Sequence, residues 1–274
     1  MSDEIDLLKA EIERLRKSLS ELTIPLEVLL ARRGFKIYKK EPSDDLLVPD
    51  DKFINDFFGN LKKYSFRLFL RDVIKNQGLF RVNDVAKYPG KETAEEYIDL
   101  LLKFRIAEPF EDGYRLAGRP VRSFGETLEW FIAQIIKRDF QAETIWGIKF
   151  KRPSVGGDYD LISKIDSSLL YMEIKSSPPK QIYDREIAAF LDRVEDLCPE
   201  IAVFFVDTEL RMKDKIVPMF ETETLRRYKE QTAVDRLKKE LFHIDNRIFI
   251  INAKSDISAN IIEVLRAFWR RNLK

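Results

Sequence analysis

Apolar residues along the chain form three successive patterns, each typical of a different kind of structure. Over residues 3–22 they alternate between spacings of three and four, at Ile5, Leu8, Ile12, Leu15, Leu19 and Leu22. This is the a/d repeat of a coiled coil, and it predicts a helix that pairs with a second copy of itself. An amphipathic helix packed on its own domain is the alternative, although such helices usually have a broader apolar stripe.

The second pattern predicts three amphipathic helices and a hairpin. The helices are expected over residues 61–76, 82–86 and 91–104, with breaks at glycine and proline-glycine positions. An Asp-Gly pair between residues 106–109 and 114–116 favours a tight hairpin. This order resembles a winged helix, a helix-turn-helix variant whose third helix lies in the DNA major groove. The preceding segment is mixed and is expected to contain a short strand at 35–38.

The third pattern alternates strands with helices. After a helix that begins near residue 123, apolar runs predict strands at 144–151, 159–165, 168–175, 201–206 and 247–252. Residues 201–206 are continuously apolar, as expected for a strand that is buried on both faces. The alternation predicts an α/β domain with a mixed sheet. The expected domains are therefore a coiled-coil helix (1–24), a connecting segment (25–60), a winged-helix-like domain (61–120) and an α/β domain (121–274).

Composition narrows the classes of function without choosing one. The 274 residues are 45% hydrophobic, and 48 basic residues nearly balance 47 acidic ones. Any affinity for nucleic acid must therefore come from local patches. One cysteine and one histidine exclude a disulfide framework and a cysteine zinc site, and they disfavour a Ser-His-Asp hydrolase. No apolar run approaches the ~20 residues of a membrane span, so a cytoplasmic protein with no membrane partner is expected.

Acidic residues stand where two predicted strands would otherwise be apolar. A two-residue loop at 166–167 joins these strands, and that register places Asp160 directly opposite Glu173. Facing carboxylates have Cβ atoms ~5 Å apart and repel each other, so a proton or a bound cation must offset the repulsion. Strand alternation puts Lys175 on the same face as Glu173. The pattern predicts a site for a divalent metal and an activated water.

The order of these residues resembles the PD-(D/E)xK superfamily of restriction-endonuclease-like nucleases. An acid-bearing helix, Gly-x-Asp at a strand and Glu-x-Lys on the next strand carry the likeness, over roughly residues 120–206. It implies an α-β-β-β-α-β core in which Glu129, Asp160 and Glu173 hold Mg²⁺ or Mn²⁺, with help from the carbonyl of Ile174. Lys175 would then position or deprotonate the attacking water and stabilise the charge that develops on phosphorus.

Two glutamates of the helix near residue 123 are expected to have different roles. Ser123 and Glu126 fit a capping box at its start. Glu129 precedes Ile132 and Ile136 by three and seven residues, so it borders the apolar face of the helix. Because a carboxylate turned toward the core needs a partner, Glu129 is favoured over Glu126 as the third acid of the site.

Contacts to substrate are expected from two places. Lys180, Gln181 and Arg185 open the helix after the Glu-x-Lys strand, where phosphates could bind. The 61–122 segment contributes cations that could contact a DNA backbone, namely Arg67, Arg71, Lys75, Arg81, Lys87, Lys103, Arg105 and Arg115. Its third predicted helix is acidic, which would be unfavourable in a DNA groove. Contact with DNA and contact with protein both stay open for this segment.

The sequence as a whole predicts a Mg²⁺-dependent endonuclease that hydrolyses phosphodiester bonds in duplex or structured DNA. Residues 5–22 are expected to form a homodimer, which would suit cleavage of both strands. A metal-free salt bridge among Asp160, Glu173 and Lys175 is the alternative for the site. A non-catalytic DNA-binding or scaffold protein that retains the fold, and an RNA- or structure-selective nuclease, are the alternative functions.

Overall fold

An eight-stranded mixed sheet forms the centre of the computed structural model, in the order β1-β4-β5-β6-β7-β10-β9-β8. Residues 24–151, 155–229 and 232–270 are described, together with Leu8, Glu11, Ile12, Arg14 and Leu15. Strand β7 pairs in parallel with β6 and β10, and the other neighbours are antiparallel. The strands are β1 (Ile37–Lys39), β4 (Glu143–Phe150), β5 (Tyr159–Ile165), β6 (Ser168–Lys175), β7 (Ile201–Val206), β8 (Asp235–Lys238), β9 (Leu241–Ile244) and β10 (Ile248–Asn252).

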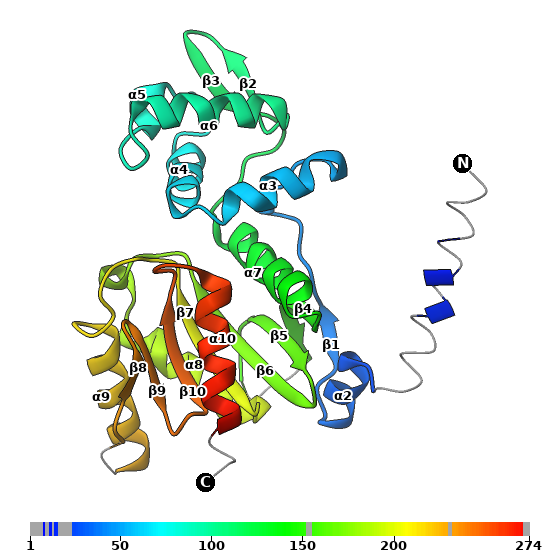
Figure 1. Cartoon of the computed structure of the whole chain (residues 1–274), viewed down its shortest axis with the longest axis vertical. Coiled ribbons are helices and arrows are strands. Elements are labelled where there is room, and N and C mark those ends of the chain that lie inside the picture. Colours follow the sequence, from blue (N-terminus) through cyan, green and yellow to red (C-terminus); the bar gives the residue numbers. More distant parts are fainter. Residues whose placement is uncertain are drawn as a thin grey trace.

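Helices cover both faces of the sheet, which makes the chain a mixed α/β protein (Figure 1). Helices α7 (Gly125–Asp139) and α10 (Ile257–Arg270) contribute to one apolar core, and α8 (Asp184–Leu197) and α9 (Ile216–Tyr228) to the other. Strand β7 serves both cores, since Phe205 lies in the first and Phe204 in the second. Its continuous apolar run follows from burial on both sides.

The segment before α7 is mainly helical, and in Figure 1 its residues 54–116 lie above the sheet, whereas residues 26–32 lie beside it. Its elements are α2 (Leu26–Arg32), η1 (Asp51–Phe53), α3 (Ile54–Leu61), α4 (Tyr64–Lys75), α5 (Val82–Val85), α6 (Lys91–Lys103), β2 (Ala107–Phe110) and β3 (Gly113–Leu116). Helix α4 buries Phe66, Phe69, Leu70 and Val73, which is the i, i+3, i+4, i+7 spacing of one helix face. These side chains belong to the same apolar core as α7 and α10, so the helical segment and the sheet are packed together.

Within the described residues the predicted strands and helices occur close to the expected places, with four additions. Strands β8 and β9 and helices α2 and α3 did not stand out in the sequence. Strand β8 has only four residues, and most of them are exposed at the edge of the sheet, so its apolar pattern is weak. Strand β1 was expected, but its addition to β4 at the opposite edge depends on a tertiary contact.

The predicted coiled-coil helix falls largely outside the described residues. Of its apolar positions, Leu8, Ile12 and Leu15 are described, and each is exposed. Within the described ranges, no helix is both long and apolar enough to cross a membrane.

Candidate active site

The β5–β6 hairpin brings Asp160, Glu173 and Lys175 to one end of the sheet. Its register runs from Ile165 opposite Ser168 to Leu161 opposite Met172, as predicted for a two-residue loop. Beyond this pair the ladder ends, and the Asp160 carboxylate accepts a hydrogen bond from the backbone N–H of Ile174, with Oδ2 2.7 Å from the nitrogen. The Asp160 carboxylate is therefore turned toward the backbone of β6.

Glu173 is almost completely buried and is surrounded by donors. Its Oε1 lies 2.9 Å from Lys175 Nζ, and its Oε2 lies 2.9 Å from Arg193 Nη1 of helix α8. The Tyr171 hydroxyl also donates to Oε2. Lys175 Nζ is shared with Glu186, at 3.4 Å from Oε1. Two cations and a hydroxyl thus satisfy Glu173 within the protein itself.

Glu129 reaches the site from the other side of the sheet end. Its Oε2 is 3.7 Å from the place where a Cβ on Gly147 of β4 would lie. Gly147 has a φ of +57°, and a Cβ there would approach Pro42 Cδ to 2.3 Å, so glycine is required for this packing. Among the residues described, Glu129 makes no hydrogen bond or ion pair. Its carboxyl group is therefore largely desolvated and has no hydrogen-bond partner among the described residues.

Burial and the charge of neighbouring carboxylates make Glu129 and Asp160 weak acids. Burial, then the charge of Asp160, raises the pKa of Glu129 to about 10. Burial, then the charge of Glu173, raises the pKa of Asp160 to about 8, although Lys175 acts in the opposite direction. At neutral pH both groups favour the protonated form in the absence of a cation, because each carries unfavourable charge interactions.

The described side chains include no group of three or more His, Cys, Asp or Glu residues gathered as metal ligands. The structure brings Glu129 and Asp160 within electrostatic reach of each other, while Glu173 is occupied by Lys175 and Arg193. The backbone N–H of Ile174 is engaged by Asp160. The alternative ion pair between Glu173 and Lys175 is present, but it does not include Asp160 directly.

The start of helix α7 differs from the prediction. The capping box is wrong: α7 begins at Gly125 with Phe124 as its N-cap, and Glu126 instead accepts from the backbone N–H of Asp45 at 2.9 Å. The segment around residue 45 competes for this carboxylate, which sequence spacing does not reveal.

The three predicted substrate-binding residues do not converge on one surface. Gln181 lines a large cleft beside the ends of β6 and β7, whereas Arg185 lines a different hollow beside Lys215. Lys180 lies next to Gln181 in η2 (Pro179–Gln181), and its carbonyl accepts from Lys215 Nζ at 3.0 Å.

A buried ion-pair cluster anchors the helical segment to the sheet. Asp207, directly after β7, is fully buried and accepts from Arg67 Nε and Nη2 at 2.9 and 2.8 Å, and Arg71 also donates to it. Its backbone N–H donates to the carbonyl of Lys175 at 2.8 Å. Arg67 is 1% exposed, so the expectation that it contacts DNA is wrong.

Sequence reasoning missed Arg193, which faces Glu173 from helix α8. A signal for it exists in the helix phase. Arg193 stands seven residues after Glu186 and next to the buried Val194, so both charged residues border the apolar stripe that packs on the sheet.

The fold and this site define a mixed α/β protein with a buried acidic cluster at the end of a β-hairpin. No protein-family model matches the chain, and no curated protein matches it. Among solved structures it is similar to Can2 from Sulfobacillus thermosulfidooxidans in complex with cyclic tetra-adenylate, at 17% identity and a TM-score of 0.53 over 88% of this chain and 60% of that chain. Protein VC1899 from Vibrio cholerae is 13% identical, with a TM-score of 0.46 over 90% of this chain and 61% of its own.

The likeness to Can2 shows a shared fold. The chain spans 60% of the length of that Can2 chain, so the remainder of Can2 has no counterpart in the comparison. The comparison therefore supports the α/β fold and carries no residue roles to this chain.

The pKa values of Glu129 and Asp160 predict how stability varies with pH in metal-free buffer. Their folded pKa values, about 10 and about 8, exceed the unfolded values of ~4.3 and ~3.9, so the folded state holds more protons between these limits. The stability that these groups contribute is complete below pH ~4 and is lost as pH rises through the folded pKa values. We expect the thermal midpoint of the unsubstituted chain to fall from pH 6 to 9 more steeply than that of Glu129→Gln. Parallel slopes in scanning fluorimetry with EDTA would contradict this prediction.

Proposed function

We propose that the chain is a metal-dependent nuclease that hydrolyses phosphodiester bonds in DNA with a site of the PD-(D/E)xK kind. One observation carries the proposal: the largely desolvated carboxyl groups of Glu129 and Asp160 have raised pKa values, Asp160 contributes to the shift of Glu129, and Glu173 and Lys175 lie on the strand next to Asp160. Protonation or a bound cation would reduce the electrostatic repulsion between these carboxylates.

The chemistry of the donor set fits a hard divalent cation. Glu129 offers a carboxylate without a hydrogen-bond partner among the described residues, and Asp160 offers one that is held by a single backbone N–H; carboxylate oxygens are ligands that Mg²⁺ and Mn²⁺ prefer. The cation would be held by these two residues, with Glu173 and the carbonyl of Ile174 as the further proposed donors. When bound, it would supply Lewis acidity toward the scissile phosphate.

Lys175 is proposed to act as an ammonium ion. Burial lowers the pKa of Lys175, but the charges of Glu173 and Asp160 more than offset this, and the net shift raises it. A lysine that stays protonated at neutral pH cannot serve as the base for the attacking water. Held by Glu173 and Glu186, it instead orients the water and stabilises negative charge that develops on the phosphoryl oxygens.

A non-catalytic nucleic-acid-binding protein is the second candidate function. The contacts of Lys175 and Arg193 with Glu173 favour it, because they compensate that carboxylate without any metal. An RNA-directed nuclease would use the same site, since the proposed groups contact the phosphate and its attacking water.

A cleavage assay tests the proposal. Labelled single-stranded, duplex and branched DNA and RNA are incubated with the full chain in Mg²⁺, Mn²⁺ or EDTA, with and without cyclic tetra-adenylate, the ligand of the Can2 structure. Cleavage that needs a divalent cation and disappears in Asp160→Ala supports the nuclease. Binding without cleavage under every condition favours the second candidate.

We also propose that residues 5–22 join two copies of the chain. Leu8, Ile12 and Leu15 are 59%, 48% and 50% exposed, which leaves an apolar stripe uncovered in the single chain. A coiled-coil partner would cover it. Deletion of residues 1–22 is expected to convert a dimer into a monomer, as measured by light scattering. An unchanged mass would remove the coiled coil from the proposal.

The segment of α4, α5, α6 and the β2–β3 hairpin is proposed to be winged-helix-like. Its elements occur in the expected order, but four acidic residues of α6 are exposed, namely Glu92, Glu95, Glu96 and Asp99. Phosphates would be repelled by these side chains, so insertion of α6 into a duplex groove is disfavoured. The segment must approach nucleic acid through another surface, or use α6 for protein contacts.

A further inference from the structure

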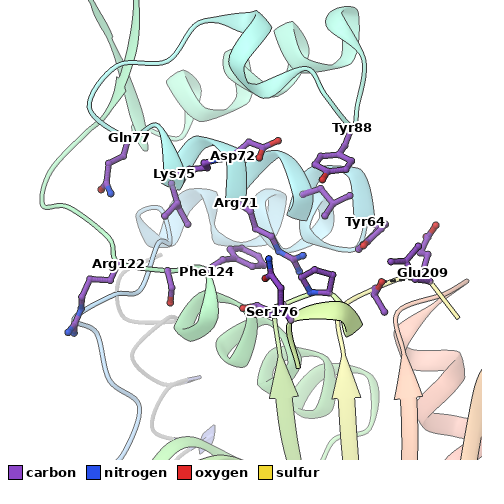
Figure 2. A pocket seen from close by; sticks show the side chains of 18 residues that line it. Tyr64, Arg71, Asp72, Lys75, Gln77, Tyr88, Arg122, Phe124, Ser176 and Glu209 are labelled. Atoms are coloured by element: carbon purple, nitrogen blue, oxygen red, sulfur yellow. Dashed lines mark hydrogen bonds between the residues drawn. The ribbon is translucent and has the colours of Figure 1, made fainter. Parts of the chain in front are cut away.

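A cleft of about 860 Å³ lies between helix α4 and the carboxyl ends of strands β6 and β7. Figure 2 shows it from close by, with Arg71 reaching from α4 toward the strand ends where Ser176 lies. Its volume falls within the ~300–1,000 Å³ of small-molecule sites. Ligands of open α/β sheets bind outside the carboxyl ends of the strands, where this cleft is located. Ser176 also directly follows Lys175, so the cleft begins one residue beyond the proposed active site.

The lining combines cations with aromatic rings and hydroxyl groups. Its cations are Arg71, Lys75 and Arg122, its rings are Tyr64, Tyr88 and Phe124, and its hydroxyls include Ser123, Ser176, Ser177 and Thr208. In Figure 2 the two tyrosines lie at one end of the cleft, with Gln77 and Arg122 at the other. The cleft is therefore elongated, with the two tyrosines and Arg122 at opposite ends and Arg71 over the ring of Phe124.

Several of these groups are available for a ligand. Tyr88 is 51% exposed, and Lys75 is exposed without an ion pair or hydrogen bond to any described residue. Arg71 Nε and Asp72 Oδ2 are buried and, among the described residues, have no hydrogen-bond partner.

We propose that this cleft binds unpaired nucleotides of a nucleic-acid strand and leads that strand toward Lys175. Exposed rings stack on bases only where those bases are not paired, while cations contact the phosphates between them. The cleft, and not α6, is therefore the proposed contact surface for nucleic acid, because the exposed acidic residues of α6 repel a duplex. The inference deepens the proposed function and rests on it for the role of the bound strand as substrate.

Binding is measured with the full chain carrying Lys175→Met, so that strands are not cut. Fluorescence anisotropy with labelled single-stranded DNA, single-stranded RNA and duplex DNA of one sequence is expected to give tighter binding to the single strands. Comparison of the single-stranded DNA with the single-stranded RNA shows which of the two nucleic acids the cleft prefers. Duplex binding as tight as single-strand binding overturns the proposal.

Substitutions at two exposed residues of the cleft are compared with control substitutions of the same residue types at the carboxyl end of α9. Tyr88→Ala is expected to weaken single-strand binding about tenfold or more, because a stacked base is lost. Lys75→Gln is expected to weaken it and to lower its dependence on salt. Tyr228→Ala and Lys229→Gln remove the same groups elsewhere and should leave binding unchanged. If both cleft variants bind single strands as tightly as the chain with Tyr88 and Lys75 intact, the assignment is overturned.

The same variants separate this inference from the proposed function. Metal-dependent cleavage that requires Lys175, combined with unchanged binding by the Tyr88 and Lys75 variants, refutes the cleft and leaves the nuclease. Single-strand binding that depends on Tyr88 and Lys75, without cleavage by the unsubstituted chain, supports the cleft and refutes the nuclease.

Discussion

Lys175→Met is expected to lower the rate constant of cleavage by at least about 10²–10³-fold, the loss seen when one preorganised electrostatic group is removed from an active site. Nζ of Lys175 is held between Glu173 and Glu186, at 2.9 and 3.4 Å from their oxygens. Methionine fills nearly the same volume but has no charge, so water is no longer oriented and the charge on the phosphoryl oxygens is no longer stabilised. Single-turnover kinetics with saturating Mg²⁺ measure the effect.

Affinity for substrate separates this role from a structural one. Lys175 lies outside the cleft lining, so Lys175→Met should change the rate constant and leave the dissociation constant nearly intact. Lys229→Met is the matched control, because it removes an exposed lysine at the end of α9. A rate constant equal to that of the unsubstituted chain would exclude Lys175 from the chemistry. A large loss of the thermal midpoint in Lys175→Met would instead assign it to packing.

Asp207→Ala is expected to lower the free energy of unfolding by roughly 3–5 kcal/mol, as found when one partner of a buried ion pair is removed. Arg67 is 1% exposed and Asp207 is fully buried, so the guanidinium would remain in the core without its carboxylate. Two hydrogen bonds from Arg67 Nη1 to the carbonyls of Leu61 and Lys62 hold it in place. Urea denaturation followed by circular dichroism measures the loss.

An exposed ion pair supplies the control for this substitution. Arg81 and Asp112 form a similar bidentate contact on the surface, with side chains 50% and 66% exposed. Solvent screens such pairs, so Asp112→Ala should leave the unfolding midpoint nearly unchanged. Similar losses in both variants would show that burial does not set the strength of the Asp207 cluster.

The Asp207 cluster also joins two parts of the proposed machinery. Arg67 and Arg71 come from α4, which forms one wall of the cleft, and the backbone N–H of Asp207 donates to the carbonyl of Lys175. The position of the wall and that of the lysine are thus fixed by the same residue. Sequence spacing gives no sign of this, since 140 residues separate Arg67 from Asp207.

Local patterns determined the strands of the β5–β6 hairpin and their register. Alternation of apolar side chains has a period of two, so a slip by one residue would turn the buried set outward, and the short loop leaves little choice. The pairing of Ile165 with Ser168 could therefore be derived from sequence, whereas the predicted position of Asp160 directly opposite Glu173 lies beyond the end of the ladder. The helix phase of Glu129 was equally accessible, because α7 buries one broad face.

Charge partners were not determined by these patterns. Asp160 turns to the N–H of Ile174, Glu173 is held by Arg193, and Glu126 binds the backbone at Asp45 and not the start of its own helix. Each choice depends on which donor from a distant segment is nearest in space. Short strands such as β8 were missed for a related reason, since pairing at a sheet edge and not apolar pattern stabilises them.

By itself, the sequence specified the mixed α/β order of elements and the two acids and lysine of the hairpin, because hydrophobic burial acts through short and regular spacings. Only the tertiary structure decided that Glu129 lies uncompensated beside Gly147, that Asp207 anchors α4, and that a cleft opens between that helix and the strand ends. Hydrogen bonds and ion pairs act over a few ångströms in space, whatever the separation along the chain, and so become visible only once the chain is folded.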